Sequence, residues 1–214
     1  MSSDDTIEKI KKFAICNYVV RSESDSGIYE ALNKGIAMAT GDIIGFLHSD
    51  DFFSNENCVQ KIVDTFKDTN STAVYSDLVY VNRNDTSIVL RYWKSGLYNK
   101  GKIINGWMPP HPTVFIRESV IRNYTFNLEY RISADYDVLL RLFSNDKNFI
   151  SYIPSVLVHM RVGGISNRSL ANIILKTKED YKAIKANKIG GVLTVVMKNL
   201  RKLSQFSVVG AFKK

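Results

Sequence analysis

Two adjacent carboxylates, Asp50 and Asp51, closely follow the apolar run DIIGFL at residues 42–47, with His48 and Ser49 between. Such a run is typical of a strand buried on both faces, and ligands of open α/β sheets bind where these strands end. Carboxylate oxygens suit Mg²⁺ or Mn²⁺, whereas an unpaired buried carboxylate is costly in free energy. The pair therefore indicates a divalent-cation site, or else a solvated turn before the next helix.

The spacing of apolar residues predicts the elements that position these carboxylates. Helices are predicted at residues 3–12, 28–39, 56–67, 135–144, 168–186 and 190–203. Strands are predicted at 15–20, 42–47, 112–116 and 152–160, with a β-hairpin formed by TAVYSDLVYVN and TSIVLRYW and a loop over 93–110. Because strands and helices alternate in the first third, we expect an α/β fold with a mostly parallel sheet.

Composition and charge narrow the class of protein. With 214 residues, 45% of them hydrophobic, the chain can bury a core without disulfide staples. Cys16 and Cys58 match no metal or disulfide pattern, which favours a reducing compartment. The polar start MSSDDTIEKIKKF and the lack of a long apolar run predict a cytoplasmic location. The net charge of +8 favours anionic partners, but no nucleic-acid motif occurs, so we expect no nucleic-acid binding.

Residues 25–51, DSGIYEALNKGIAMATGDIIGFLHSDD, resemble the pattern of family 2 glycosyltransferases with the GT-A fold. In that family a loop with Asp, Ser and Gly leads into an A-x-N-K-G-I helix, then A-T-G-D, and a strand that ends in a DXD-type pair. The resemblance is closest to bacterial enzymes of colanic-acid-like, capsular or lipopolysaccharide synthesis. It continues through HPTVFIR, ISADYDVLLRL and the tail segments GGISNRSL and LRKLSQF. It implies a GT-A domain over 1–165 and a helical, basic tail over 166–214.

The resemblance assigns roles to the residues of the matched segment. Asp51 is expected to ligate Mn²⁺ or Mg²⁺, and Asp50 to contact the ribose of the nucleotide or share the metal. Asn33 and Lys34 are expected near the nucleotide-sugar donor, together with two residues of the preceding loop, Asp25 and Gly27. Asn33 also fits a helix-packing residue, and Lys34 fits a solvated charge.

The family carries Glu-Asp before an apolar helix, and its aspartate is the catalytic base; here the pair is Ala134 and Asp135. The resemblance therefore implies inverting transfer in which Asp135 accepts the proton of an acceptor hydroxyl. Asp135 also suits the N-cap of its helix, and the two roles are compatible. Three further residues are expected to contact the acceptor, although each also fits a structural role: Trp107, His111 and Asp137.

The segment at residues 189–203 predicts an amphipathic helix with a basic border. Its apolar residues are Val192, Val195, Val196, Leu200 and Leu203, bordered by Lys198, Arg201 and Lys202. Such a helix can lie in a membrane interface, or pack on the domain with a solvated basic face. We favour peripheral contact with the inner face of the cell membrane, because acceptors in such pathways are generally lipid-linked.

The resemblance also implies a strand–helix–strand opening ahead of the segment at which this sequence starts. MSSDDTIEKIKKF resembles the family's later G-S-T-D-G-T-x-E-I-I-K-K stretch, so we expect either a longer protein or an impaired product. The expected function is transfer of a sugar from a UDP-linked donor to a glycan or lipid-linked glycan. The alternatives are a non-catalytic glycan- or partner-binding homologue and a nucleotidyltransferase, the latter disfavoured because no Gly-rich phosphate loop is present.

Overall fold

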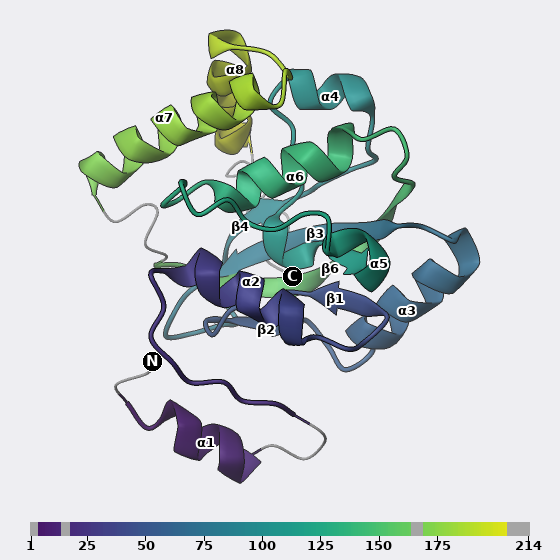
Figure 1. The fold of residues 1–214 in the computed structure, drawn as a ribbon, viewed down its shortest axis with the longest axis vertical. Coiled ribbons are helices and arrows are strands. Elements are labelled where there is room, and N and C mark those ends of the chain that lie inside the picture. The colour runs from purple at the N-terminus through teal and green to yellow at the C-terminus, as the bar shows by residue number, and fades with distance from the viewer. Residues whose placement is uncertain (1–3, 14–17, 164–168, 205–214) are drawn as a thin grey trace.

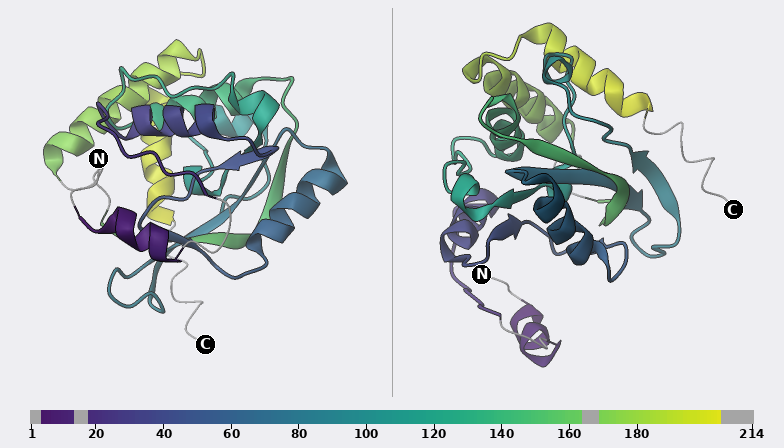
Figure 2. Two further views of the ribbon diagram at one scale, coloured as in Figure 1. Left: turned by 60° about the horizontal axis from the view of Figure 1, so that its bottom comes forward. Right: turned by 90° about the vertical axis from the view of Figure 1, so that its right-hand side faces the viewer.

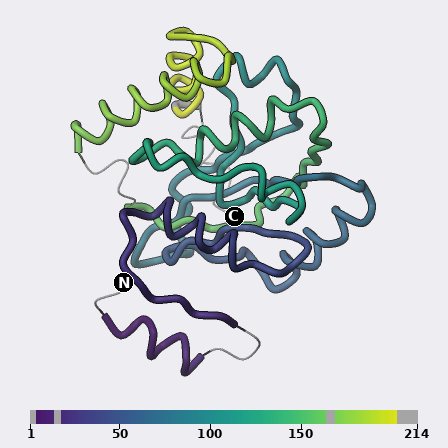
Figure 3. Tube along the Cα trace, in the orientation of Figure 1, coloured from purple at the N-terminus to yellow at the C-terminus, as the bar shows by residue number. Residues whose placement is uncertain are grey.

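The computed structural model describes residues 4–13, 18–163 and 169–204 (Figures 1 and 3). The helices are α1 (Thr6–Phe13), α2 (Ile28–Met38), α3 (Cys58–Thr69), α4 (Lys100–Ile104), α5 (Glu118–Ile121), α6 (Ala134–Ser144), α7 (Leu170–Ala186) and α8 (Val192–Ser204), with a 3-10 turn η1 (His111–Thr113). The strands are β1 (Ile43–Gly45), β2 (Asp51–Phe53), β3 (Ala73–Val81), β4 (Val89–Trp93), β5 (Phe115–Arg117) and β6 (Ile150–Arg161).

These strands form one sheet in the order β1-β5-β3-β6-β2, with β4 paired to β3. The α/β layout and the β3–β4 hairpin are confirmed, but the expectation of a mostly parallel sheet is wrong for the described strands. Only β3 and β6 run parallel, and the other four pairs are antiparallel. Alternation along the chain was misleading because β1 and β2 lie at opposite edges, with the later strands β5 and β6 inserted between them.

Other differences from the predicted elements are local. Residues 18–20 are not in a strand, and the adjoining residues 14–17 lie outside the described part of the chain. The run DIIGFL contributes only the three residues of β1. The predicted loop over 93–110 contains α4, which Asn99 caps by accepting a hydrogen bond from the Gly101 N–H over 2.8 Å.

Helices cover both faces of the sheet (Figures 1 and 2). One core cluster joins Tyr75 of β3 to Ile36 of α2, Leu139 of α6 and Ile184 of α7. A second cluster joins the alternate side chains Val74 and Leu78 of β3 to Ile62 and Phe66 of α3. Helix α1 has no buried residue and stands apart from both layers at the end of an extended segment.

Candidate active site

Four residues lie in register across neighbouring strands at one end of the sheet. Asp51 of β2 is opposite Met160 of β6, Met160 is opposite Tyr80 of β3, and Tyr80 is opposite Arg91 of β4. Residues that are partners in register project from the same face of a sheet. In agreement, the Arg91 guanidinium lies 4.7 Å from the centre of the Tyr80 ring. The row therefore places a carboxylate, a phenol and a cation on one surface.

Asp51 is a buried carboxylate without a hydrogen-bond partner. Asp51 is the first residue of β2 and is 7% exposed. Neither of its carboxylate oxygens has a hydrogen-bond partner in the structure. Burial, and then the neighbouring charge of Asp50, raise the pKa of Asp51 to about 6, against an opposing effect of Arg161. Since buried polar groups are normally satisfied, two orphaned oxygens indicate a ligand that would bind them.

Arg161 holds the backbone at Asp50, the residue before Asp51. Arg161 donates from Nη1 to the Asp50 carbonyl over 2.9 Å, and its guanidinium lies 4.8 Å from the centre of the Phe52 ring. These contacts hold the backbone at the strand entry, while the Asp50 side chain stays half-buried. The Asp50–Asp51 turn is therefore anchored through its main chain.

The carboxylates of Asp50 and Asp51 suit a cation such as Mg²⁺ only if a bound ligand supplies further oxygen atoms to the metal. Within residues 4–13, 18–163 and 169–204, no group of three or more His, Cys, Asp or Glu side chains could hold a metal. Mg²⁺ typically uses one or two carboxylates and takes its other oxygens from substrate phosphates and water. The orphaned oxygens of Asp51 thus fit a cation that arrives with a phosphorylated ligand.

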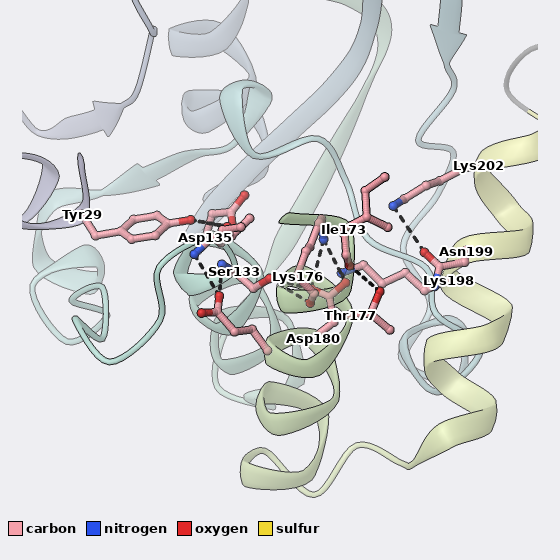
Figure 4. A network of polar contacts seen from close by, with 12 residues as sticks. Tyr29, Ser133, Asp135, Ile173, Lys176, Thr177, Asp180, Lys198, Asn199 and Lys202 are labelled. Atoms are coloured by element: carbon pink, nitrogen blue, oxygen red, sulfur yellow. Dashed lines mark hydrogen bonds and ion pairs between the residues drawn. The ribbon is translucent and has the colours of Figure 1, made fainter. Parts of the chain in front are cut away.

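Asp135 lies in the first turn of α6 and is approached by the hydroxyl of Tyr29 from α2 (Figure 4). The Tyr29 hydroxyl donates to the Ile132 carbonyl and lies 3.3 Å from Oδ1 of Asp135. A carboxylate in the first turn is also favoured by the positive end of the helix dipole. Asp135 is half-buried, so it combines a fixed position with access to solvent.

The loop that leads into α6 is held by one carboxylate of α7. Glu179, which is 7% exposed, accepts hydrogen bonds from the backbone N–H groups of Arg131, Ile132 and Ser133 over 2.8, 2.9 and 2.9 Å. These are charge-assisted bonds to the residues just before Ala134. Glu179 therefore fixes the backbone from which Asp135 projects.

Tyr80 connects the two carboxylate regions. Burial raises the pKa of Tyr80, Arg91 opposes the shift, and the charges of Asp51 and Asp135 both add to it. Both carboxylates are therefore close enough to act on one phenol, although α6 and β2 are about 80 residues apart in the chain. Since Asp51 and Tyr80 also lie in the same row of the sheet, this electrostatic link favours a single site for the two carboxylates.

Two histidines border this site. Their ring centres lie 6.0 Å apart, and the His111 ring stacks on Phe46 with centres 5.3 Å apart. Burial lowers the pKa of His111 to about 4, against the charge of Asp135, which raises it, and with His48, which lowers it. Burial also lowers the pKa of His48, and the charge of Asp135 opposes this shift. Neutral imidazoles can donate and accept hydrogen bonds beside Asp135, as the predicted acceptor role of His111 requires.

Asp25 and Lys34 lie in a separate cluster. The Lys34 ammonium is 2.7 Å from both Glu23 and Asp25 and 2.9 Å from Glu30, and these contacts raise its pKa. Gly27 precedes α2 as its N-cap. Asp25 and Lys34 both line an open hollow of about 200 Å³ between the extended segment 19–25 and α2. The sequence analysis predicts that Asp25 and Lys34 lie near the donor, and both line this hollow. Lys34, however, is already paired with three carboxylates there.

Three other predicted residues have structural contacts. Asn33 pairs with the backbone of Phe126 through two hydrogen bonds of 2.9 and 2.8 Å, which supports its helix-packing interpretation. Asp137 is buried and bonds Arg141 and Asn187 over 2.9 and 2.8 Å. Trp107 is 7% exposed and donates to the Ser95 carbonyl over 2.7 Å. The face of its indole therefore has little room for a sugar.

The sequence interpretation missed Glu179, Tyr29, Tyr80 and Arg161. Glu179 is more than 40 residues from the backbone it binds, and its role depends on how α7 docks against α6. Tyr29 belongs to the segment that resembles the glycosyltransferase pattern, but nothing local indicates its contact with Asp135. Only Arg161 had a sequence signal, since a cation at the end of a predicted strand is a candidate partner for acids at another strand end.

Comparison with known proteins decides the family. Residues 1–125 match the sequence model of Glycosyl transferase family 2. The chain belongs to this family. A PGL/p-HBAD biosynthesis glycosyltransferase of Mycobacterium tuberculosis is 25% identical over 181 residues, which cover 82% of this chain and 68% of that protein. The Chondroitin synthase of Escherichia coli is 25% identical over 187 residues, covering 86% of this chain and 26% of that protein.

The fold is that of a family 2 glycosyltransferase of the GT-A type, as predicted. The crystal structure of S. aureus TarS in complex with UDP-GlcNAc superposes with a TM-score of 0.64 at 16% identity. The match covers 99% of this chain and 62% of that chain, so this sequence spans about three-fifths of the solved structure. Among the helices that the structure describes, none combines the length and apolar character needed to cross a membrane.

Proposed function

We propose that this glycosyltransferase moves a sugar from a UDP-linked donor to a glycan or lipid-linked glycan, with inversion at the anomeric carbon. The observation that carries this proposal is that both oxygens of Asp51 are buried and unsatisfied, in the row of the sheet that also contains Tyr80. The charges of Asp51 and Asp135 both raise the pKa of Tyr80, which supports a common site. Binding of UDP-GlcNAc by TarS, which shares the fold, supports a nucleotide-sugar donor.

Asp51, with Asp50 beside it, is proposed to hold Mn²⁺ or Mg²⁺ together with the phosphates of the donor. A divalent cation at that position supplies positive charge against the departing diphosphate. Arg161 keeps the Asp50–Asp51 backbone in place through its bond to the Asp50 carbonyl. The buried position of Asp51 excludes water from its carboxylate and so strengthens its attraction for a cation.

Asp135 is proposed to accept the proton of the acceptor hydroxyl. As the acceptor oxygen bonds to the anomeric carbon, the bond from that carbon to the diphosphate oxygen breaks, and the proton passes to the Asp135 carboxylate. A positioned base typically contributes about 10²–10⁴-fold to the rate. Tyr29 and Glu179 orient this group, the first through its hydroxyl and the second through the backbone of residues 131–133.

The proposal is tested by calorimetry of UDP binding with and without Mn²⁺, and by release of UDP from a panel of UDP-sugars. We expect Mn²⁺ to strengthen UDP binding at least tenfold in the wild-type chain and to have no effect in Asp51→Asn. Metal-dependent binding that survives in Asp51→Asn would remove this residue from the donor site. A chain that binds UDP but transfers no sugar would favour the alternative of a binding homologue.

Peripheral membrane contact through residues 189–203 belongs to the same proposal. The exposed apolar residues of α8 are Val192, Leu193, Val196 and Leu200. Val195 and Lys198 instead face the protein, with 6% and 4% exposed, which corrects their predicted place on the outer face and at its border. The side chain of Leu203 lies outside the described residues. The outward stripe on α8 remains apolar and suits a membrane interface.

A further inference from the structure

A cavity of about 100 Å³, here called the α8 hollow, lies between α8 and the segment that follows β4. Its lining includes four cations, which are Lys94, Lys198, Arg201 and Lys202. The other lining residues are Trp93, Gly106, Trp107 and Met108, so none of the lining side chains is acidic. A concave surface with charges of one sign concentrates their field, and this one attracts anions.

The surrounding chain does not balance these cations. Asp180 is the last acidic residue of the sequence, and every charged side chain after it is a lysine or an arginine. Oδ2 of Asp180 lies 2.9 Å from the Lys176 ammonium and 2.7 Å from the Lys198 ammonium. One carboxylate shared by two ammonium groups leaves a positive excess, because each buried cation needs a counter-charge.

Lys198 shows this excess most directly. The residue is 4% exposed, and its ammonium lies 3.1 Å from the centre of the Tyr136 ring. Although Lys198 is close to Asp180, its Nζ is buried and makes no well-oriented hydrogen bond in the structure. An ammonium carries three donors, and buried donors are normally satisfied. An anion in the α8 hollow would supply acceptors that this lysine lacks.

The pKa values of two lining lysines reflect the same excess. Burial, then Lys176 and Arg91, lower the pKa of Lys202 to about 8, while Asp180 opposes them. Burial and Lys176 also lower the pKa of Lys198 well below its ordinary value. A bound anion would offset this repulsion and favour the charged form of both lysines.

The cations of α8 are held in position by contacts with the segment after β4. Gly106 adopts a positive φ of 72°, and a side chain there would collide with the Lys198 backbone. Arg201 donates from Nε to the Asn105 carbonyl over 2.8 Å. Because its walls are fixed to each other, the α8 hollow exists before any ligand binds.

A series of contacts connects the α8 hollow to Asp135 (Figure 4). Lys198 pairs with Oδ2 of Asp180, and Oδ1 of Asp180 accepts a hydrogen bond from the Ser133 hydroxyl over 2.8 Å. Ser133 is the N-cap of α6, two residues before Asp135. Burial acts to lower the pKa of Lys176, but the charges of Asp180 and Asp135 are among those that raise it. The α8 hollow is therefore a near neighbour of the proposed base.

The α8 hollow is separate from the expected position of the donor diphosphate. Trp93 is on β4, and three strand spacings separate β4 from β2, which carries Asp51. Three spacings correspond to about 14 Å along the sheet, which is longer than a diphosphate group. An anion in the α8 hollow is therefore not the diphosphate of the donor.

Trp93 indicates that the anion is part of a sugar and not a free ion. This residue is half-buried, and the Arg91 guanidinium lies 5.4 Å from the centre of its ring. Sites for organic ligands combine apolar and aromatic lining with a few placed polar groups, as Trp93 and Met108 do here with the cations. The ring carbons of a sugar can pack against an indole, whereas inorganic phosphate gains nothing from it.

We propose that the α8 hollow binds a carboxylate or phosphate group of the acceptor glycan, so that the enzyme selects acidic acceptors. This inference rests on the proposed function, in which Asp135 accepts a proton from an acceptor hydroxyl. The charged group anchors the glycan at α8, and a neighbouring sugar extends towards Asp135. A neutral glycan of the same shape is disfavoured, because it leaves the cations without a counter-charge.

The first test is calorimetry of trigalacturonate and of its methyl ester, with the full chain in EDTA. Esterification removes the charge and keeps the sugars, so we expect the acid to bind at least tenfold more tightly. Lys94→Gln combined with Lys202→Gln should abolish this preference without lowering the melting temperature. Lys61→Gln combined with Lys178→Gln, both on exposed residues, removes the same charge and should change affinity less than twofold. Equal binding of acid and ester by the wild-type chain would overturn the site, as would wild-type affinity in the first double variant.

A second comparison separates a charged sugar from a free anion. We expect Trp93→Leu to weaken binding of trigalacturonate at least threefold and to leave the affinity for inorganic phosphate unchanged. Glucose 6-phosphate identifies the charged group: tighter binding than trigalacturonate supports a phosphate on the glycan, and weaker binding supports a carboxylate. Inorganic phosphate that binds as tightly as both sugars would show a site for free ions and overturn the proposal.

Asp51→Asn separates this site from the donor site. We expect it to leave trigalacturonate affinity in EDTA unchanged, because neither Asp50 nor Asp51 lines the α8 hollow. Binding that requires Mn²⁺ and disappears in Asp51→Asn would place the ligand at the donor site and overturn the proposal. None of these measurements depends on sugar transfer, so failure of the proposed function and failure of this site are distinguishable.

The acceptor role is tested by transfer from UDP-GlcNAc to paired acidic and neutral oligosaccharides of the same length. We expect kcat/KM to be at least tenfold higher for the acidic member of a pair, and this ratio to approach one in Lys94→Gln with Lys202→Gln. An equal or higher kcat/KM for the neutral members in the wild-type chain would overturn the acceptor role.

Discussion

The hydroxyl of Tyr29 lies 3.3 Å from Oδ1 of Asp135, which connects α2 to the base proposed on α6. The same hydroxyl has one proton and donates it to the Ile132 carbonyl at the shorter contact, so it fixes the loop before Asp135 and lies beside the carboxylate. We expect Tyr29→Phe to lower kcat about three- to tenfold and to leave the affinity for UDP unchanged. Steady-state kinetics and calorimetry check this. A weaker affinity for UDP with unchanged kcat would show that Tyr29 serves the donor.

Asp135→Asn should abolish turnover and spare donor binding. The variant keeps the size and the position of the side chain but cannot accept a proton, and a base contributes about 10²–10⁴-fold. We expect kcat to fall by at least a hundredfold, with the Mn²⁺-dependent Kd for UDP within twofold of wild type. Transfer at a rate near that of the wild-type chain would exclude Asp135 as the base.

Asp51 is expected to make the stability of the metal-free protein depend on pH. Its folded-state pKa is raised from 3.8 to about 6, so its favourable contribution is present below pH 4 and is lost as the pH rises towards 6. Asp51→Asn removes this loss. The metal-free variant should therefore be more stable than wild type above pH 6 and equally stable at pH 4.

Thermal melting in EDTA between pH 4 and pH 8 measures this difference. Asp68→Asn, an exposed change on α3, is the control and should leave the pH profile unaltered. Adding Mn²⁺ with UDP at pH 8 should stabilise the wild-type chain and not Asp51→Asn. If the metal-free variant melts below wild type at pH 8, the carboxylate has a stabilising partner and the interpretation of its burial is wrong.

Features of the candidate site that depend on residues adjacent in the sequence could be predicted. Features that depend on how distant strands and helices pack together could not. Asp51 shortly after an apolar run is a local pattern, and so is Asp135 at the start of an apolar helix. The placement of β1 and β2 at opposite edges depends on strands that come later in the chain. The inward direction of Lys198 depends on Asp180 of another helix, because apolar periodicity alone does not reveal a buried ion pair.

Glu179→Gln tests whether the α6 entry loop positions the base. The carboxylate accepts three backbone hydrogen bonds, and an amide presents only one acceptor oxygen, so at least one buried N–H loses its partner. We expect a loss of about 2 kcal/mol in stability and a lower kcat. Chemical denaturation and kinetics measure the two effects. Glu129→Gln, on an exposed residue, should leave both unchanged, and an unchanged kcat in Glu179→Gln would restrict its role to folding.

The exposed stripe of α8 is expected to bind anionic membranes. Leu193, Val196 and Leu200 are 73%, 46% and 53% exposed, so about half or more of each residue's surface stays accessible after folding. Full burial of one such side chain is worth about 1.5–3 kcal/mol, and each nearby cation adds about 1 kcal/mol at an anionic surface. In vesicle sedimentation we therefore expect at least tenfold tighter binding to anionic than to neutral vesicles. Replacing the three residues with Ser should abolish binding, whereas Ile173→Ser with Ile174→Ser, exposed on α7, should not. An equal loss of vesicle binding in both variants would indicate nonspecific hydrophobic adsorption and contradict a specific membrane face.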